Sequence, residues 1–407
     1  KSLKLKTAII DNSFLGGTCL NKGCIPAKTL IYSSRLFSIA GKFPFFGLEN
    51  VTPGINFLKV QDRKDRLVES LRLGMNSMLK GVDFFNAKAR LLGPGRVLAG
   101  ENTLETKYIL IATGSICAGL EGWGFDGGRI ISSDDILSLK EVPPSLLVIG
   151  GGVIGCEFAS LFSNLGSAVS IVEKARNLLP GEDPEVSRKI EALFKRRGIK
   201  VYVQADISGI NTEGFSKILV AVGRLPNIDL PGISEAGVEI EENRIKIDEY
   251  SRTTAENVYA AGDCASSVML ANFAGYQGAL AVDNMVGSSR KMEPGLVPNA
   301  VFTDPEIASV GLSEDAALRR NMNITVSRFD YLGSAMARIL DETQGFVKLI
   351  SEKDSGILLG GTIIGPKATE IVGILSLGVS SRLSVRDLRN AIFAHPTIAE
   401  SIGEALR

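Results

Sequence analysis

The glycine-rich segment at residues 145–173 constrains the fold of this chain more than any other stretch. In "VIGGGVIGCE", Gly150, Gly152 and Gly155 have the spacing G-x-G-x-x-G, between the apolar run "SLLVIG" and the helix-like segment "CEFASLFSNLG". In a strand–turn–helix unit, the first glycine allows the tight turn, the second lets a pyrophosphate approach the backbone, and the third brings helix against strand. The segment therefore predicts a dinucleotide-binding α/β unit.

An acidic residue completes this unit. The next apolar run, "AVSIVE", ends at Glu173, twenty-three residues after Gly150. A carboxylate there accepts hydrogen bonds from a ribose 2′-hydroxyl and repels a 2′-phosphate, which favours NAD over NADP. Lys174 and Arg176 weaken that preference slightly. The alternative is a glycine turn in an α/β domain that binds no nucleotide.

Strands alternate with helix-like segments along the whole chain, which is the pattern of parallel α/β sheets. The expected buried strands are residues 5–11, 107–115, 145–152, 168–173, 216–224 and 257–263. Segments 140–145 and 288–299 are broken by proline and glycine and are expected to be linkers. They divide the 407 residues into three pieces.

Composition excludes several classes of protein. The 45 basic and 45 acidic residues balance without long runs of either sign, which gives no footprint for nucleic acid or an anionic membrane. No uncharged stretch is long and continuously apolar enough to be a membrane span. Five cysteines are too few for a disulfide-rich secreted domain, so we expect a reducing compartment and a catalytic or regulatory role for any disulfide.

Two of these cysteines stand close together in "GGTCLNKGCIPAKTL", at Cys19 and Cys24. In a regular helix such a pair would have Cα atoms roughly 9 Å apart, beyond the disulfide limit of about 7 Å, so a bonded pair requires an irregular backbone. Gly23 can relax that backbone, and Pro26 suits the first turn of a helix beginning near Ile25.

The positive end of that helix, with Lys22 and Lys28, would lower the pKa of the Cys24 thiol. Cys24 is then the resting thiolate and Cys19 the sulfur open to exchange. A pair of small buried cysteines is the alternative.

The single histidine is His395, in "AIFAHPTIAES", with Glu400 five residues later. A thiol–disulfide enzyme needs a base to take a proton from its dithiol substrate, and imidazole titrates near neutrality. A carboxylate within reach would orient the ring and stabilise its charged form, and Glu400 is the candidate. A structural histidine is the alternative.

Several motifs, in this order, resemble the pyridine nucleotide-disulfide oxidoreductases over nearly the whole chain, and within that family the dihydrolipoamide dehydrogenases. They are "GGTCLNKGCIPAK", "ILIATGS", "VIGGGVIGCEFASLFSNLGS", "VAVGRLPN", "YAAGD", "VFTDPEIASVGL" and "AHPTIAES". The resemblance implies oxidation of a protein-bound dihydrolipoyl group through a Cys19/Cys24 disulfide and FAD, with reduction of NAD+. It also implies that Lys28 approaches the flavin and pairs with Glu157.

The resemblance also implies the cofactor contacts. For FAD they are Asp11, Gly17, Thr18, Lys28, Thr113, Gly114, Ser115, Asp263, Met269, Leu270 and Ala271. For NAD they are Gly150, Gly152, Val153, Ile154, Gly155, Glu157, Glu173 and Gly223. No metal site is expected.

The fold implied is α/β, with two Rossmann-like domains for FAD and NAD and a C-terminal α+β dimerisation domain. The expected boundaries are 1–142 for the first part of the FAD domain, 143–228 for the NAD domain, 229–296 for the second FAD or central part, and 297–407 for dimerisation. The partners implied are a second copy, whose His395 and Glu400 complete the disulfide site, and the lipoyl domains and core of a 2-oxo acid dehydrogenase complex. The location implied is the bacterial cytoplasm or, in a eukaryote, the mitochondrial matrix or a plastid.

The chain departs from the family pattern at four places. It starts at what resembles the second strand of the FAD domain, without the preceding glycine loop, and the connection before "SKILVAVGR" is short. Phe393 and Asn272 stand where relatives often have histidine. Two alternative functions remain: another flavin-dependent disulfide or metal reductase of the glutathione or mercuric reductase kind, and a flavin-free scaffold.

Overall fold

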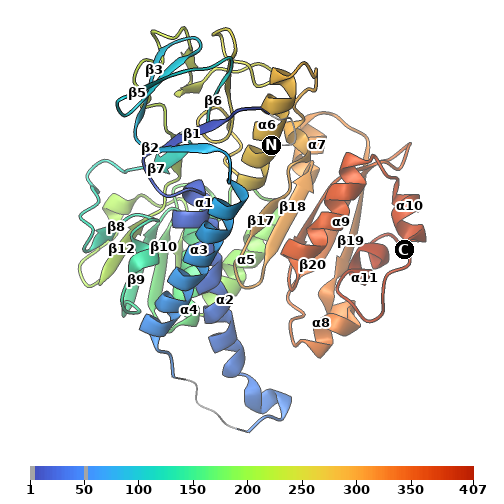
Figure 1. Cartoon of the computed structure of the whole chain (residues 1–407). Helices are drawn as coiled ribbons and strands as arrows, with labels where there is room; N and C mark the ends of the chain where they lie inside the picture. The colour runs from blue at the N-terminus through green and yellow to red at the C-terminus, as the bar shows by residue number, and fades with distance from the viewer. Residues whose placement is uncertain (1–4, 50–53) are drawn as a thin grey trace. The chain divides into compact units, whose positions relative to one another are not determined.

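The computed structural model describes residues 5–49 and 54–407. Its chain forms two compact units, each built from separated segments (Figure 1). The first unit comprises residues 1–30, 58–118 and 224–294, and the second comprises residues 31–57, 119–223 and 295–407. Across the described part of the chain, no helix combines the length and the apolar character needed to cross a membrane.

The second unit contains a five-stranded parallel sheet (Figure 1). Its strands, in spatial order, are β11 (Lys200–Tyr202), β10 (Ala168–Val172), β9 (Ser145–Ile149), β12 (Lys217–Val220) and β8 (Ile130–Ile131). The central strands are buried on both faces, as expected of parallel strands covered by helices, which explains their unbroken apolar sequence. This sheet confirms the expected Rossmann-like architecture.

Helices connect these strands. Helix α4 (Val153–Asn164) leads from β9 to β10, and α5 (Pro184–Arg196) leads from β10 to β11. Helix α5 begins where it does because Asp183 Oδ1 accepts a hydrogen bond from the Glu185 amide at 2.8 Å, with proline at the first helical position. The short 3-10 helices η2 (Ile136–Ser138) and η3 (Ile207–Gly209) complete this region.

A second, antiparallel sheet lies near the C-terminus of the chain. In spatial order its strands are β17 (Asn299–Val301), β18 (Ile307–Gly311), β21 (Leu358–Ile364), β20 (Phe346–Glu352) and β19 (Ile324–Asp330). Helix α9 (Ala368–Ser380) packs on it through Ile371, Val372 and Leu375 (Figure 1). Other short helices of the unit are α7 (Glu314–Arg319), η5 (Tyr331–Gly333), α8 (Ala335–Ile339), α10 (Val385–Asn390), α11 (Glu400–Glu404) and η1 (Phe43–Phe46).

The first unit is built from small sheets. Two are parallel pairs, β1 (Ala8–Asp11) with β2 (Asp83–Asn86), and β6 (Ile109–Ile111) with β16 (Val258–Ala260). The antiparallel groups are β3 (Ala89–Gly93) with β4 (Arg96–Ala99) and β5 (Asn102–Glu105), β7 (Ser115–Cys117) with β13 (Arg224–Pro226), and β14 (Ile240–Glu241) with β15 (Arg244–Ile245). A common core joins β3, β4, β6, β15 and β16.

The helices of the first unit are α1 (Gly17–Lys22) and α6 (Ala271–Met285). Helices α2 (Cys24–Ala40) and α3 (Phe57–Met78) each continue from one unit into the other. The strand expected at residues 107–115 is divided into β6 and β7, because Gly114 has a φ of +70° that turns the chain toward an antiparallel pairing with β13.

Candidate functional site

The two cysteines of the sequence motif lie on either side of a helix break. Helix α1 ends before Gly23, whose φ of −145° and ψ of −115° are not helical, and α2 begins at Cys24. The irregular backbone that contact between Cys19 and Cys24 requires is therefore present, and the helix starts one residue before the expected Ile25. All five cysteines fall in the described residues, where none of them forms a disulfide bond.

The side chains of Cys19 and Cys24 are in hydrogen-bond contact. That contact, together with burial and the negative charge of Cys24, holds the pKa of Cys19 well above its usual value, while Lys28 acts in the opposite direction. The contact with Cys24 and burial thus favour the protonated thiol of Cys19. The thiolate expected at Cys24, in the first turn of α2, stays a prediction.

The histidine and its acidic partner are also adjacent. His395 Nδ1 lies 2.9 Å from Glu400 Oε1, and Glu400 Oε2 accepts a hydrogen bond from the Thr397 amide at 2.8 Å. These hydrogen bonds, that of the amide above all, hold the pKa of Glu400 below its usual value. The His395 side chain is 75% exposed, so its ring faces outward from its own unit. His395 and Cys19 belong to different units, and each pair is described by itself.

The glycine fingerprint forms the expected turn between β9 and α4. Gly150 has a φ of +107°, and a Cβ there would meet Ala221 O at 2.4 Å, whereas a Cβ on Gly155 would meet Gly150 O at 1.9 Å. These two glycines are required by packing. Gly152, the N-cap of α4, has open space where its Cβ would stand, so the helix N-terminus, with Val153 and Ile154 in its first turn, is accessible to a phosphate.

Glu173 directly follows β10 and points back at this turn. Its two carboxylate oxygens accept hydrogen bonds at 2.6 Å from the amides of Gly151 and Ala175. Gly223, with a φ of +117°, follows the end of β12, where Ala221 packs against Gly150. The positive end of α4 and the open space at Gly152 fit the pyrophosphate of a dinucleotide, whereas the position of its ribose near Glu173 stays a prediction.

A second group of expected cofactor residues comes together in the first unit. Ser115 Oγ donates to Asp263 Oδ2 at 2.5 Å, and Thr113 Oγ1 donates to Asn227 O at 2.5 Å. Arg224 donates to both Ser115 Oγ and Ser115 O at 2.8 Å. A carboxylate beside a turn that carries hydroxyl groups can accept hydrogen bonds from the ribityl hydroxyls of a flavin nucleotide.

The remaining expected flavin contacts occupy strand and helix ends of the same unit. Asp11 ends β1 and accepts from the Ser13 amide at 2.9 Å. Gly17 and Thr18 open α1. Leu270, directly after Met269, is the N-cap of α6, which begins at Ala271. The structure does not test the common role of these three segments, which stays a prediction.

Glu157 is buried on α4, with 4% of its surface exposed. Its Oε1 accepts a hydrogen bond from the Phe302 amide at 2.9 Å. The predicted partner Lys28 belongs to the other unit, so that pairing stays a prediction. Two of the four departures from the family pattern are side chains: Phe393 packs against the C-terminal core, and Asn272 Oδ1 accepts from the Phe273 amide at 3.0 Å.

Comparison with known proteins identifies the family. The sequence matches the pyridine nucleotide-disulphide oxidoreductases over residues 1–278 and their dimerisation domain over residues 297–406. The chain belongs to this family. Dihydrolipoyl dehydrogenase from Bacillus subtilis is 34% identical, covering 99% of this chain and 92% of that protein. Dihydrolipoyl dehydrogenase from Chlamydia trachomatis is 35% identical, covering 98% of this chain and 91% of that protein.

Solved structures of the family agree with the fold. LpdA from Mycobacterium tuberculosis superposes with a TM-score of 0.92 at 26% identity, covering 99% of this chain and 93% of that one. The HOCl-induced flavoprotein disulfide reductase RclA from Escherichia coli gives 0.88 at 26% identity, covering 100% of this chain and 94% of that one. As a family member, the chain is an oxidoreductase that uses FAD and NAD, and its dimerisation domain supports a homodimer.

Sequence reasoning assigned no role to Ser160, Arg197, Arg224 or the segment 302–306. That segment lies in the motif "VFTDPEIASVGL", which contributes to the family resemblance but predicts no contact for these residues. Arg224 stands in another such motif, "VAVGRLPN".

Proposed function

We propose that this oxidoreductase is a dihydrolipoyl dehydrogenase, which oxidises a protein-bound dihydrolipoyl group and reduces NAD+. The observation that carries the proposal is the hydrogen-bonded Cys19–Cys24 pair at the start of α2. The relatives that this chain matches over nearly their full length are dihydrolipoyl dehydrogenases. Bound FAD would supply the two-electron carrier between this dithiol and NAD+.

Cys19 and Cys24 have different roles in thiol–disulfide exchange, because their surroundings differ. Oxidised to a disulfide, the pair is attacked at Cys19 by a substrate thiolate, and Cys24 leaves as the thiolate that the first turn of α2 stabilises. The second substrate thiol then displaces Cys19, which releases the lipoyl disulfide and leaves the enzyme dithiol. In that dithiol the raised pKa of Cys19 favours its protonated form, and the proposal assigns the negative charge to Cys24.

His395 acts in this scheme as the base that takes the proton of the substrate thiol. Glu400, 2.9 Å from Nδ1, orients the ring and stabilises the imidazolium. An outward-facing base on the dimerisation domain suits a site completed by a second copy, so we place His395 and Glu400 opposite the cysteines of the partner subunit.

The cofactor contacts that we propose are those implied by the family resemblance. FAD is assigned to Asp11, Gly17, Thr18, Lys28, the turn 113–115, Asp263 and residues 269–271. NAD is assigned to Gly150, Gly152, Val153, Ile154, Gly155, Glu157, Glu173 and Gly223. The domain assignment is 1–142 and 229–296 for FAD, 143–228 for NAD, and 297–407 for dimerisation.

The partners would be the lipoyl domains and core of a 2-oxo acid dehydrogenase complex, because these carry the substrate of enzymes with this name. The enzyme would then share the compartment of that complex, which is the cytoplasm in a bacterium.

Reduction of another disulfide is the second candidate, favoured by the similarity to the flavoprotein disulfide reductase of Escherichia coli. Purified protein should be yellow, and it should reduce NAD+ with dihydrolipoamide faster than it consumes NADH or NADPH with glutathione disulfide. A colourless protein would favour a scaffold, and a preference for glutathione disulfide would favour the reductase.

The role of each cysteine is tested by the visible spectrum. Partial reduction should produce a long-wavelength charge-transfer band between the Cys24 thiolate and the bound flavin. Cys24→Ser should abolish the band, whereas Cys19→Ser should retain it without substrate. The reverse pattern would exchange the two roles.

A further inference from the structure

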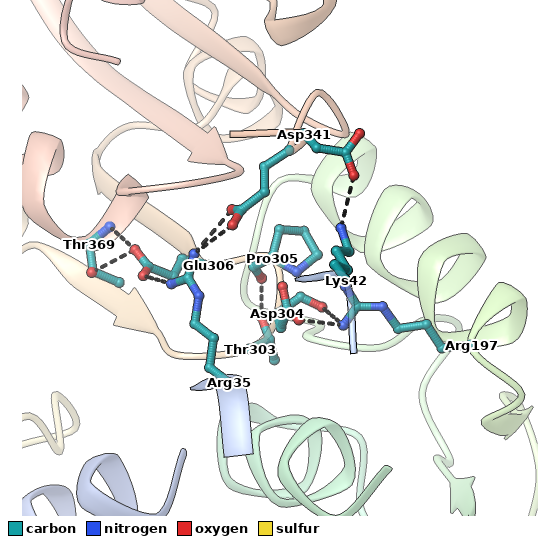
Figure 2. Close-up of polar contacts among 10 residues, drawn as sticks. Arg35, Lys42, Arg197, Thr303, Asp304, Pro305, Glu306, Asp341 and Thr369 are labelled. Atoms are coloured by element: carbon teal, nitrogen blue, oxygen red, sulfur yellow. Dashed lines mark hydrogen bonds and ion pairs between the residues drawn. The ribbon is translucent and has the colours of Figure 1, made fainter. Parts of the chain in front are cut away.

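The segment from Phe302 to Glu306 lies between β17 and β18 and is held by side chains far away in sequence. Figure 2 shows the contacts of Asp304 and Glu306. Its first residues meet helix α4. The Phe302 amide donates to Glu157 Oε1 at 2.9 Å, and the Asp304 amide donates to Ser160 Oγ at 3.1 Å. Glu157 and Ser160 are three residues apart on the helix and share one face, so two amides hold that face.

The guanidinium group of Arg197, at the C-terminal end of α5, contacts the same segment. Arg197, the C-cap of that helix, donates from Nη1 to Asp304 O at 2.7 Å and lies 2.9 Å from Asp304 Oδ2 (Figure 2). Ser160 and Arg197 therefore hold Asp304 through its amide, its carbonyl and its carboxylate.

The far end of the segment is fixed by Glu306. Its Oε1 accepts from Arg35 of α2 at 2.7 Å, and its Oε2 accepts from Thr369 Oγ1 at 2.8 Å (Figure 2). Arg35 also donates to Glu342 at 3.0 Å. With both ends tied, the Phe302 amide has little freedom to move away from Glu157.

We propose that Arg197 and Ser160 are positioning residues for the reaction with NAD, acting through the Phe302 amide on the Glu157 carboxylate. This inference rests on the proposed function, which places Glu157 at the nicotinamide and beside Lys28. A hydrogen bond from an amide to a carboxylate is charge-assisted and directional, so it fixes both the place and the orientation of the charge. Small displacements of a charge at a reacting centre cost rate even when binding is kept.

The main test is Arg197→Met. Because the side chain of Arg197 is 36% exposed, its loss should leave the fold intact. Deuterium exchange at the Phe302 and Asp304 amides should become faster, and flavin reduction by NADH in stopped flow should slow by about three- to tenfold. Reduction by dihydrolipoamide should stay unchanged.

The matched control is Arg328→Met, because Arg328 has a similar exposure of 39% and pairs with Glu185 and Asp330 in the same unit, away from this segment. It should alter neither amide exchange nor the NADH reaction. Arg197→Lys should recover part of the lost rate, since it keeps a charge beside Asp304. Ser160→Ala is an independent test, because it removes the hydroxyl that accepts from the Asp304 amide. It should also make deuterium exchange at that amide faster.

The decisive measurement is a double-mutant cycle with Glu157→Gln. If Arg197 acts through the carboxylate charge, Arg197→Met should slow the NADH reaction far less once that charge is gone. Equal slowing in both backgrounds, or an unchanged NADH rate in Arg197→Met and Ser160→Ala, would overturn the inference and leave the proposed function standing. An unmodified enzyme whose flavin NADH does not reduce would instead refute the proposed function.

Discussion

His395 Nδ1 lies 2.9 Å from Glu400 Oε1, and the same carboxylate is held by the Thr397 amide at 2.8 Å. The carboxylate is thus fixed before it orients the ring. Because His395 is the only histidine of the chain, an imidazole titration in catalysis has a single source.

His395→Gln should therefore slow reduction of the enzyme by dihydrolipoamide by about 10² to 10⁴-fold, the usual contribution of a positioned base. Glu400→Gln should give a smaller defect in the same half-reaction, because it keeps the imidazole. Stopped-flow traces for NADH should change little in both variants. An unimpaired dithiol reaction in His395→Gln would end the assignment of the base.

Mixing His395→Gln chains with Cys19→Ser chains tests the shared site. Heterodimers would contain one intact site, whereas neither homodimer contains any. Activity should thus recover after the chains are unfolded and refolded together, and no recovery would place the base and the cysteines within one chain.

Glu173 should set the preference for NAD over NADP. Replacing it by alanine together with Lys174→Arg removes a repulsive charge and gives a 2′-phosphate a partner. The ratio of kcat/KM for NAD to kcat/KM for NADP should therefore fall by about tenfold or more. Glu173 also accepts from the Gly151 amide at 2.6 Å, so thermal unfolding should be checked alongside. Equal kcat/KM values for both cofactors in the unmodified enzyme would contradict the assignment.

Lys348 should be important for stability. Its ammonium group is buried and lies 3.0 Å from Asp183 Oδ2 and 2.5 Å from Glu314 Oε2. Lys348→Met would leave the buried Asp183 without its cation, at a cost of about 3–5 kcal/mol. Lys42→Met, which breaks the exposed pair with Asp341, should cost at most about 1 kcal/mol. If Lys348→Met and Lys42→Met had nearly the same thermal midpoint, Lys348 would not have this stabilising role.

Glu182 should make stability depend on pH. Burial raises the pKa of its carboxyl, although hydrogen bonds with Asn299 and Ser309 lower it, and within residues 5–49 and 54–407 no group forms a hydrogen bond with Oε2. A folded-state pKa above that of the unfolded chain, about 4.3, means that stability is lost as pH rises through the folded value. Glu182→Gln should therefore raise the thermal midpoint at about pH 8, and the gain should vanish near pH 4. A gain that is independent of pH would show that the carboxyl does not titrate in this way.

Local patterns in the sequence determined much of the fold and part of the site. The strand–turn–helix around Gly150 and Gly155 could be predicted because the turn itself is local: Gly150 has a positive φ, and a Cβ on Gly155 would meet the backbone oxygen of Gly150, five residues earlier. The pairing of His395 with Glu400 was predictable for the same reason, since five residues separate them. The division of residues 107–115 into two strands was not predicted, because the turn at Gly114 follows from pairing with β13, more than one hundred residues later.

Only the tertiary structure decided which distant groups meet. The Phe302 amide reaches Glu157 across 145 residues, Ser115 reaches Asp263 across 148, and Lys348 reaches Asp183 across 165. No spacing rule covers such distances, because they depend on how sheets and helices pack. The amide that holds Glu157 was invisible for a further reason: nearly every residue carries a backbone N–H, and only the path of the chain selects the one that donates. The sequence thus determined the chemical groups and their local turns, and the packing of the chain selected the groups that hold them in place.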